Sequence, residues 1–247
     1  MSIAAADASR NALCSLLETL MSRWSLDQHA REPRLKELER VIREILADSS
    51  TPPQQCVELL SIYDPMVKWR TEKAACPRSD VMRLCEAKSC RSIPDEAISR
   101  ILVDHFLKDG SNICWFHNKS KEWCDMNQGR SDTSCVLVGS FKEATIQHHD
   151  LALGFMYLEP GTTYPAHAHS GIEVYYIVAG RCLMSKARGA FQWQVAGDVV
   201  IHEAHEVHAA ICDSDEGVLI LWSKWNDTDQ VYYFVQHDRE SDVSSKL

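Results

Sequence analysis

Two histidines and a glutamate lie close together in the stretch Gly161 to Gly180, GTTYPAHAHSGIEVYYIVAG. His167 and His169 are two residues apart, so both imidazoles leave the same face of an extended segment. A small-residue step then permits a turn before the strand that carries Glu173. Two imidazoles and one carboxylate form a donor set that suits Fe, Zn, Mn, Co or Ni without selecting among them. We therefore expect one divalent transition-metal ion here.

The spacing of this stretch resembles the first metal-binding signature of the cupin superfamily. Gly161 is followed by five residues, His167, one residue, His169, three residues, Glu173, six residues and Gly180. The resemblance implies a β-barrel fold of the jelly-roll type, with the three side chains as ligands of one metal ion.

The segment Gly197 to Cys212, GDVVIHEAHEVHAAIC, offers three histidines as the source of a fourth ligand. The second cupin signature runs Gly, five residues, Pro, one residue, Gly, two residues, His. His208 matches its last position, whereas Glu203 replaces the Pro and His205 replaces the turn Gly. We therefore expect His208 to be the fourth ligand. His205 is its rival, and both His205 and His202 are candidates for groups at the rim or behind the ligands.

Among cupins, the segment is similar to the dimethylsulfoniopropionate (DMSP) lyases. Four features carry the likeness: Tyr164 before the histidine pair, Tyr175 two residues after Glu173, His208, and the stretch WSKWNDTDQVYYF. The resemblance covers roughly residues 135 to 235. It implies β-elimination of a small sulfonium carboxylate, DMSP, to dimethyl sulfide and acrylate.

The same resemblance assigns roles to aromatic side chains. Tyr175 is the expected proton-abstracting residue, since a nearby metal cation favours the phenolate form of a tyrosine. Tyr164 is expected to orient the substrate. Aromatic residues near the C-terminus offer π faces that attract a sulfonium, and alternation along a strand lets only some of them face inward. The candidates are Trp222, Trp225, Tyr232 and Tyr233, with either Tyr232 or Tyr233 lining the pocket.

Two other functions use the same ligands. A cupin dioxygenase would hold Fe(II) with the three histidines and the glutamate, and its turnover would depend on oxygen. A non-catalytic metal-binding sensor would keep the ligands, need no base, and use its helical part to engage a partner. Replacement of Tyr175 separates the lyase from the sensor.

Composition excludes several classes of partner. The net charge of -9 and the absence of a basic stripe argue against a nucleic-acid surface. No run approaches the eighteen or so apolar residues that a membrane-spanning helix needs. The N-terminal residues lack a basic region followed by an apolar core, which is the pattern of a secretory signal. We expect a cytoplasmic protein with no membrane partner.

Hydrophobic periodicity changes along the chain and predicts an α+β architecture. Apolar residues spaced by three and four predict a helical region over residues 1–110, which closes one end of the barrel or forms a homodimer interface. A connecting loop or strand pair is expected over 111–134, either as a lid or rim over the pocket or as packing between the two halves. A cupin barrel is expected over 135–247, because about eight short β-rich runs follow one another there. The expected helices cover residues 11–24, a segment after Pro33, 54–69, 80–88, and a segment from Pro94 to about Gly110.

Overall fold

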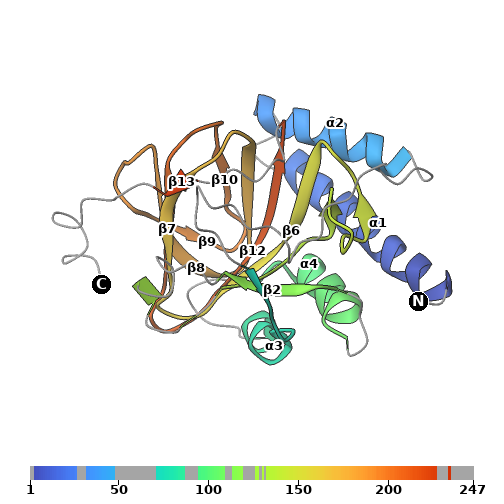
Figure 1. Cartoon of the computed structure of the whole chain (residues 1–247), viewed down its shortest axis with the longest axis horizontal. Coiled ribbons are helices and arrows are strands. Elements are labelled where there is room, and N and C mark those ends of the chain that lie inside the picture. The colour runs from blue at the N-terminus through green and yellow to red at the C-terminus, as the bar shows by residue number, and fades with distance from the viewer. Residues whose placement is uncertain are drawn as a thin grey trace.

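The computed structural model describes most of the chain in separate segments. These segments are residues 3–26, 32–47, 71–86, 94–108, 113–118, 126–127, 130, 132–226 and 233–234. Helices gather beside and beneath a curled sheet (Figure 1). The expected helix over residues 54–69 lies outside the described residues.

The helices of the described segments all precede the metal-binding stretch. They are α1 (Ile3–Leu26), α2 (Pro33–Ala47), α3 (Arg78–Glu86), α4 (Glu96–Ile101) and a π-helical turn, η3 (Leu102–Phe106). The helices expected near residues 11–24, after Pro33, near 80–88 and from Pro94 are confirmed. None of the described helices is long and apolar enough to cross a membrane.

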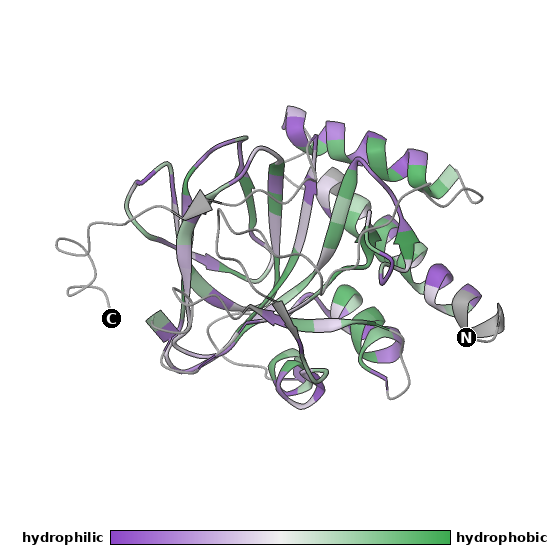
Figure 2. Ribbon diagram, viewed as in Figure 1, coloured by the Kyte–Doolittle hydropathy of each residue, from purple (hydrophilic) through white to green (hydrophobic). Residues whose placement is uncertain are grey.

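Helix α2 illustrates why these segments fold as helices. Pro33 is its first residue, where the fixed φ of proline fits and its missing N–H costs nothing. Its apolar residues recur at three and four, and all five are buried on one face. Hydrophobic and hydrophilic residues accordingly alternate along α2 in Figure 2. The buried five are Leu35, Leu38, Val41, Ile42 and Ile45.

The strands of the described residues form one curled sheet that is antiparallel except where β4 meets β5. They are β1 (Thr71–Lys73), β2 (Trp115–Asn118), β3 (Asp132–Cys135), β4 (Val138–Gly139), β5 (Ile146–Gln147), β6 (Leu151–Leu158), β7 (Thr163–Ala168), β8 (Ile172–Lys186), β9 (Gln192–Val195), β10 (Val199–His202), β11 (His208–Cys212), β12 (Val218–Trp225) and β13 (Tyr233–Phe234). Their main order is β1-β2-β3-β6-β12-β8-β11-β7-β13, with β9 and β10 also paired to β8.

Strand β8 joins the two halves of the curled sheet. The runs EVYYIVAG and RCLMSKA, which the sequence suggests are separate strands, form this single strand. Its first part pairs with β12 and β10, whereas its second part pairs with β11 and β9. Gly180 lies where the two parts meet, with a left-handed φ of 77°. A Cβ at this position would come within 2.0 Å of the Gly217 carbonyl oxygen, so only glycine fits this corner.

Side chains alternate between two cores across the first half of the sheet. Residues such as Val174, Tyr176 and Leu221 pack with the helices, in what we call the helix-facing core. The opposite face forms the barrel lumen, a second buried cluster that includes Tyr175 and Trp222. This alternation is the period of two expected for β-strands, and it determines which residues reach the centre of the barrel.

The segment between the helices and the metal-binding stretch contains paired strands. Strand β2 pairs with β3, so the strand-pair alternative for residues 111–134 is confirmed. Strand β1 pairs with the other edge of β2 and was not expected within the helical region. Trp115 is buried in the helix-facing core, whereas Phe116 is buried in the lumen. The sheet therefore extends back into the part of the chain that carries the helices.

Asp95 ties the helices to β8. One of its carboxylate oxygens accepts hydrogen bonds from two first-turn amides of α4, at 3.1 and 3.2 Å. The other oxygen accepts a hydrogen bond from the Tyr176 hydroxyl at 2.6 Å. It also forms an ion pair with Arg23 at 3.1 Å. The backbone N–H of Asp95 donates to the Val178 carbonyl at 2.7 Å. One residue thus caps a helix and fixes it against the strand that carries Glu173.

We expect Asp95→Ala to lower the free energy of unfolding by about 2.5–4 kcal/mol. The lost N-cap accounts for about 1 kcal/mol and the lost buried hydrogen bond from Tyr176 for about 1.5–3 kcal/mol. Guanidinium denaturation followed by tryptophan fluorescence measures the change. Asp80→Ala is the matched control, because Asp80 lies in the first turn of α3 in an exposed ion pair with Arg83 and should cost less than about 1 kcal/mol. Equal losses for the two variants would contradict the role of Asp95.

Candidate metal centre

Three imidazoles and one carboxylate meet inside the barrel lumen. One nitrogen or oxygen atom from each of His167, His169, Glu173 and His208 lies within 4.8 Å of the others, and all four residues are buried. His167 lies on β7, with His169 directly after it, and His208 begins β11 opposite His167. Glu173 comes from β8 in the other half of the sheet. The structure brings together the four residues that the two signatures select.

Backbone carbonyls orient the three imidazoles. The Nδ1 atom of His167 lies 2.8 Å from the Pro165 oxygen, and that of His208 lies 2.9 Å from the Glu206 oxygen. His169 Nδ1 lies 3.0 Å from its own carbonyl partner, two residues ahead. A carbonyl oxygen can only accept, so each Nδ1 carries the proton and donates it. Each Nε2 therefore turns a lone pair toward the cluster, as metal-ligating histidines do.

The donor atoms are too close to be stable together without a cation. Glu173 Oε2 lies 3.0 Å from His169 Nε2 and 3.2 Å from His208 Nε2. With the protons on Nδ1, these contacts oppose lone pairs to a carboxylate oxygen, and only a proton or a metal ion between them makes the arrangement favourable. Three neutral nitrogens and one carboxylate oxygen are a common donor set for divalent transition metals. The residues present therefore fit the expected metal ion.

The surroundings favour the protonation states that metal binding requires. The pKa of His167 lies well below its ordinary value, mainly because burial disfavours the charged imidazolium. The neighbouring His208 and His169 lower this pKa further. Burial alone would raise the pKa of Glu173, but His169 and His208 beside it hold that pKa well below the usual range. A neutral imidazole and an ionised carboxylate are the ligand forms.

The two other histidines of the second signature occupy different places. His202 is buried, and its ring stacks on that of His208 with centroids 4.0 Å apart and an interplanar angle of 14°. His205 is exposed and is not among the four converging residues. His202 thus lies directly behind a candidate ligand, whereas His205 lies on the turn before β11.

The turn before β11 keeps its shape without glycine. His205 has a φ of 63°, in the left-handed region where the cupin pattern has glycine. Its backbone N–H donates to the His169 carbonyl at 2.7 Å. Histidine is one of the residues that adopt this conformation more readily than most. The substitution therefore leaves His208 directed into the barrel.

The predicted base Tyr175 and the predicted substrate residues Tyr164 and Trp222 belong to the buried lumen cluster. Tyr175 is buried, and its ring centroid lies 6.0 Å from that of His208 and 5.1 Å from that of His202. The Tyr164 ring meets that of His167 edge-on at 4.9 Å. Trp222 lies directly opposite Tyr175 on the neighbouring strand, so both side chains share the lumen face.

The remaining aromatic candidates for the substrate pocket are Trp225, Tyr232 and Tyr233. Trp225 is fully buried in the helix-facing core and does not reach the lumen. The backbone of Tyr233 pairs with that of Ala168, the residue between His167 and His169. Tyr232 lies outside the described residues. The choice between Tyr232 and Tyr233 stays a prediction.

Sequence reasoning missed Lys224. It lies on β12 as the direct partner of Glu173, and it is fully buried. The available signal was a lysine within the run GVLILWSKW, which otherwise consists of residues typical of a buried strand. Parity with Trp222, two residues earlier, was sufficient to direct it toward the lumen.

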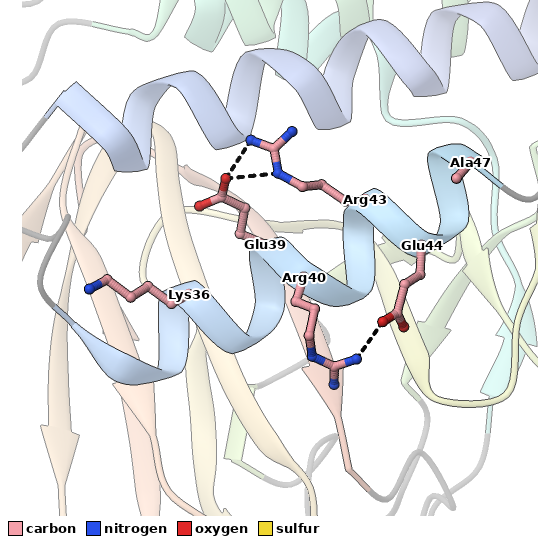
Figure 3. A pocket seen from close by; sticks show the side chains of 6 residues that line it. All are labelled: Lys36, Glu39, Arg40, Arg43, Glu44 and Ala47. Atoms are coloured by element: carbon pink, nitrogen blue, oxygen red, sulfur yellow. Dashed lines mark hydrogen bonds and ion pairs between the residues drawn. The ribbon is translucent and has the colours of Figure 1, made fainter.

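A hollow of about 450 Å³ lies on the outer face of α2, away from these residues. Its charged side chains pair with one another along the helix, Arg43 with Glu39 and Arg40 with Glu44, each at 2.5 Å (Figure 3). Such i,i+4 pairs are typical of a solvated helix face. None of the predicted site residues lines this hollow.

The buried histidines make the stability of the metal-free protein pH-dependent. Burial lowers the pKa of His167 and that of His202 well below the ordinary 6.5 in the folded state. The unfolded chain therefore binds more protons below pH 6.5, and stability falls as the pH falls. Two such groups lower the free energy of unfolding by about 2–3 kcal/mol between pH 7.5 and 5.5.

Urea denaturation of the chelator-treated protein at the two pH values measures this loss. His202→Gln should remove about half of it. His149→Gln replaces an exposed histidine and should leave it unchanged. Stability that is constant or rises toward pH 5.5 would contradict the assignment of neutral buried imidazoles.

Known proteins place this chain in a family. The sequence model of the dimethylsulfoniopropionate lyase family matches residues 70–220, more than half of the chain. A search among curated proteins finds no significant match. A chain from the crystal structures of the DMSP lyases RdDddP and RnDddQII is 18% identical, with 92% of this chain and 100% of that one covered and a TM-score of 0.58.

A second structure, the DMSP lyase DddQ from Ruegeria pomeroyi DSS-3, is also 18% identical. The match covers 89% of this chain and 96% of that one, with a TM-score of 0.53. At these identities the two structures share the fold, which is the expected α+β arrangement of N-terminal helices and a cupin barrel. Because the family match spans the site and more than half of the sequence, the chain belongs to the dimethylsulfoniopropionate lyase family.

Proposed function

We propose that this protein is a metal-dependent carbon-sulfur lyase that cleaves DMSP to dimethyl sulfide and acrylate. One observation carries the proposal: Tyr175 lies on the lumen face of β8, two residues from Glu173, with its ring 6.0 Å from that of His208. A tyrosine is thereby buried beside a donor set suited to a metal ion. Family membership supports the same reaction class.

The chemistry needs one base and no acid. A proton leaves the carbon next to the carboxylate, the new carbon-carbon double bond forms, and the carbon-sulfur electron pair departs on sulfur as neutral dimethyl sulfide. The difficult part is removal of the proton, because negative charge develops beside an existing carboxylate. The site must therefore supply a positioned base and stabilise the developing charge.

The four converging side chains provide the second requirement. A divalent ion held by His167, His169, Glu173 and His208 would act as a Lewis acid toward the substrate carboxylate and favour the phenolate form of a nearby tyrosine. The donor set suits Fe, Zn, Mn, Co or Ni. His208, whose ring lies 6.0 Å from that of Tyr175, and Glu173, two residues before Tyr175 on β8, would hold such an ion on the side of the lumen where Tyr175 lies.

The side chains of the lumen supply the positioned base and orient the substrate. We assign Tyr175 as the base that takes the proton. The buried ring of Trp222, opposite Tyr175, offers a π face for the sulfonium group. Tyr164, edge-on to His167, is assigned to orient the carboxylate end, and Tyr232 or Tyr233 is assigned to the pocket wall.

We expect Tyr175→Phe to lower the rate of dimethyl sulfide release by at least about 100-fold, the usual contribution of a general base. Its metal content should stay that of the wild type, since phenylalanine preserves the ring. Headspace gas chromatography over metal-loaded protein and DMSP, under anaerobic conditions, measures the release. Tyr176→Phe is the matched control, because Tyr176 is the next residue of β8 and faces the helices.

The same assay separates the alternatives. Release that requires oxygen would replace the lyase by an Fe(II) dioxygenase. No release after reconstitution with each of the five metals would favour a non-catalytic metal-binding protein. Full activity of Tyr175→Phe would retain the lyase and assign the base elsewhere.

A further inference from the structure

We propose that Glu206 is a positioning residue of the metal centre, which holds the candidate ligand His208 and the ring of His202 behind it. The proposal deepens the function proposed above. It rests on the metal centre of that function and makes no use of the identity of the substrate. In the second cupin signature, Glu206 is one of the two unspecified residues before the histidine.

The main chain of Glu206 orients the His208 ring. Its carbonyl oxygen accepts the Nδ1–H hydrogen bond of His208 at 2.9 Å. Its backbone N–H donates to the Glu203 carbonyl at 2.9 Å, which closes the turn between β10 and β11. The direction of the Glu206 carbonyl therefore follows from the shape of this turn. A group that fixes the turn also fixes the candidate ligand.

The carboxylate of Glu206 makes three contacts through one oxygen, Oε2. This oxygen accepts a hydrogen bond from the Glu203 backbone N–H at 3.0 Å. The Lys186 ammonium, at the end of β8, lies 3.4 Å from it. The Nδ1 atom of His202, at the end of β10, lies 3.9 Å from it. One oxygen thus joins the turn to the ends of two strands.

The contact between Glu206 and His202 is an electrostatic restraint. A carboxylate can only accept, so an attraction requires the proton of the His202 ring on Nδ1. The distance of 3.9 Å is longer than a hydrogen bond, and the carboxylate therefore acts on the ring through its charge. His202 is almost completely buried, and such an attraction is stronger where little water screens it.

The ring of His202 passes this restraint on to the site. It stacks on His208 with centroids 4.0 Å apart and meets Tyr175 edge-on at 5.1 Å. Its backbone is the direct partner of Glu173, which keeps the ring on the lumen face. In a close-packed interior, movement of this ring would displace both neighbours. Glu206 therefore acts on the candidate ligand directly through its carbonyl and indirectly through His202.

Glu206→Ala tests the proposal, because it removes the carboxylate and keeps the backbone carbonyl. We expect the dissociation constant for Co(II), measured by competition with a chromogenic chelator, to rise by about 10- to 100-fold, the usual effect of removing a group that supports a metal ligand. The visible absorption bands of the bound Co(II) should shift, because His208 is reoriented. Glu206→Gln keeps an acceptor oxygen and should bind Co(II) more tightly than Glu206→Ala. Asp215→Ala is the matched control, because it removes an exposed carboxylate from the turn at the opposite end of β11.

A double-mutant comparison tests the route through His202. His202→Phe keeps an aromatic ring for stacking and has no nitrogen to face the carboxylate. Glu206→Ala should therefore have a smaller effect on Co(II) affinity in this background than in the wild type, as expected for two residues that act through one contact. Equal effects in the two backgrounds would overturn this route.

Unchanged Co(II) affinity in Glu206→Ala would overturn the proposal, as would an equal loss in Asp215→Ala. Glu206→Gln carries the test if the alanine variant does not fold, and failure of both to fold would overturn the proposal by assigning Glu206 a purely structural role. The expected losses of Co(II) affinity in a protein that releases no dimethyl sulfide would support this inference and reject the lyase.

Discussion

Glu173 lies on a strand that is hydrogen-bonded on both sides, and the cluster around it depends on that ladder. His202 on β10 and Lys224 on β12 are its direct partners, so three ionisable side chains lie in one row across the lumen face. In the next row Tyr175 stands beside Trp222. A slip of one residue in either pairing would turn these side chains toward the helices. The positions of the candidate site residues therefore depend on the register of β8 with β10 and β12.

Polar contacts from the helical region help to hold that ladder in place, among them those of Asp95 and Arg34. Asp95 accepts a hydrogen bond from Tyr176, whose side chain leaves the back of β8 between Tyr175 and Ile177. Arg34 of α2 reaches Glu203 at 2.8 Å, on the turn that leads to His208. Glu203 occupies the position of the proline in the cupin pattern. Its contact with Arg34 of α2 takes the place of the rigid proline ring in restricting the turn. The exposed Arg34 pair adds little stability, and its contribution is to position the turn.

Much of the site could be predicted from the sequence because alternation along a strand is a local property. The spacing of His167, His169 and Glu173, and the parity of Tyr175 with Glu173, needed no knowledge of the fold. Selection of His208 over His205 needed the second signature. The structure agrees because His205 adopts the left-handed turn conformation that the glycine of that pattern would have.

Other features depend on long-range pairing, which local patterns do not contain. The single strand β8 was expected as two strands, because Gly180 looks like a turn residue and serves here as a corner between two pairings. Strand β1 exists only through its pairing with β2. The burial of Lys224 depends on the strands on either side of it, β6 and β8.

Metal analysis of three proteins tests the central claim most directly. Wild type, His208→Gln and His205→Gln are purified in parallel, loaded with the same divalent metal, and measured by mass spectrometry for metal per chain. We expect one equivalent in the wild type and in His205→Gln, and loss of the ion in His208→Gln, because only His208 is held in the converging set. Retention by His208→Gln together with loss in His205→Gln would contradict the assignment of the centre.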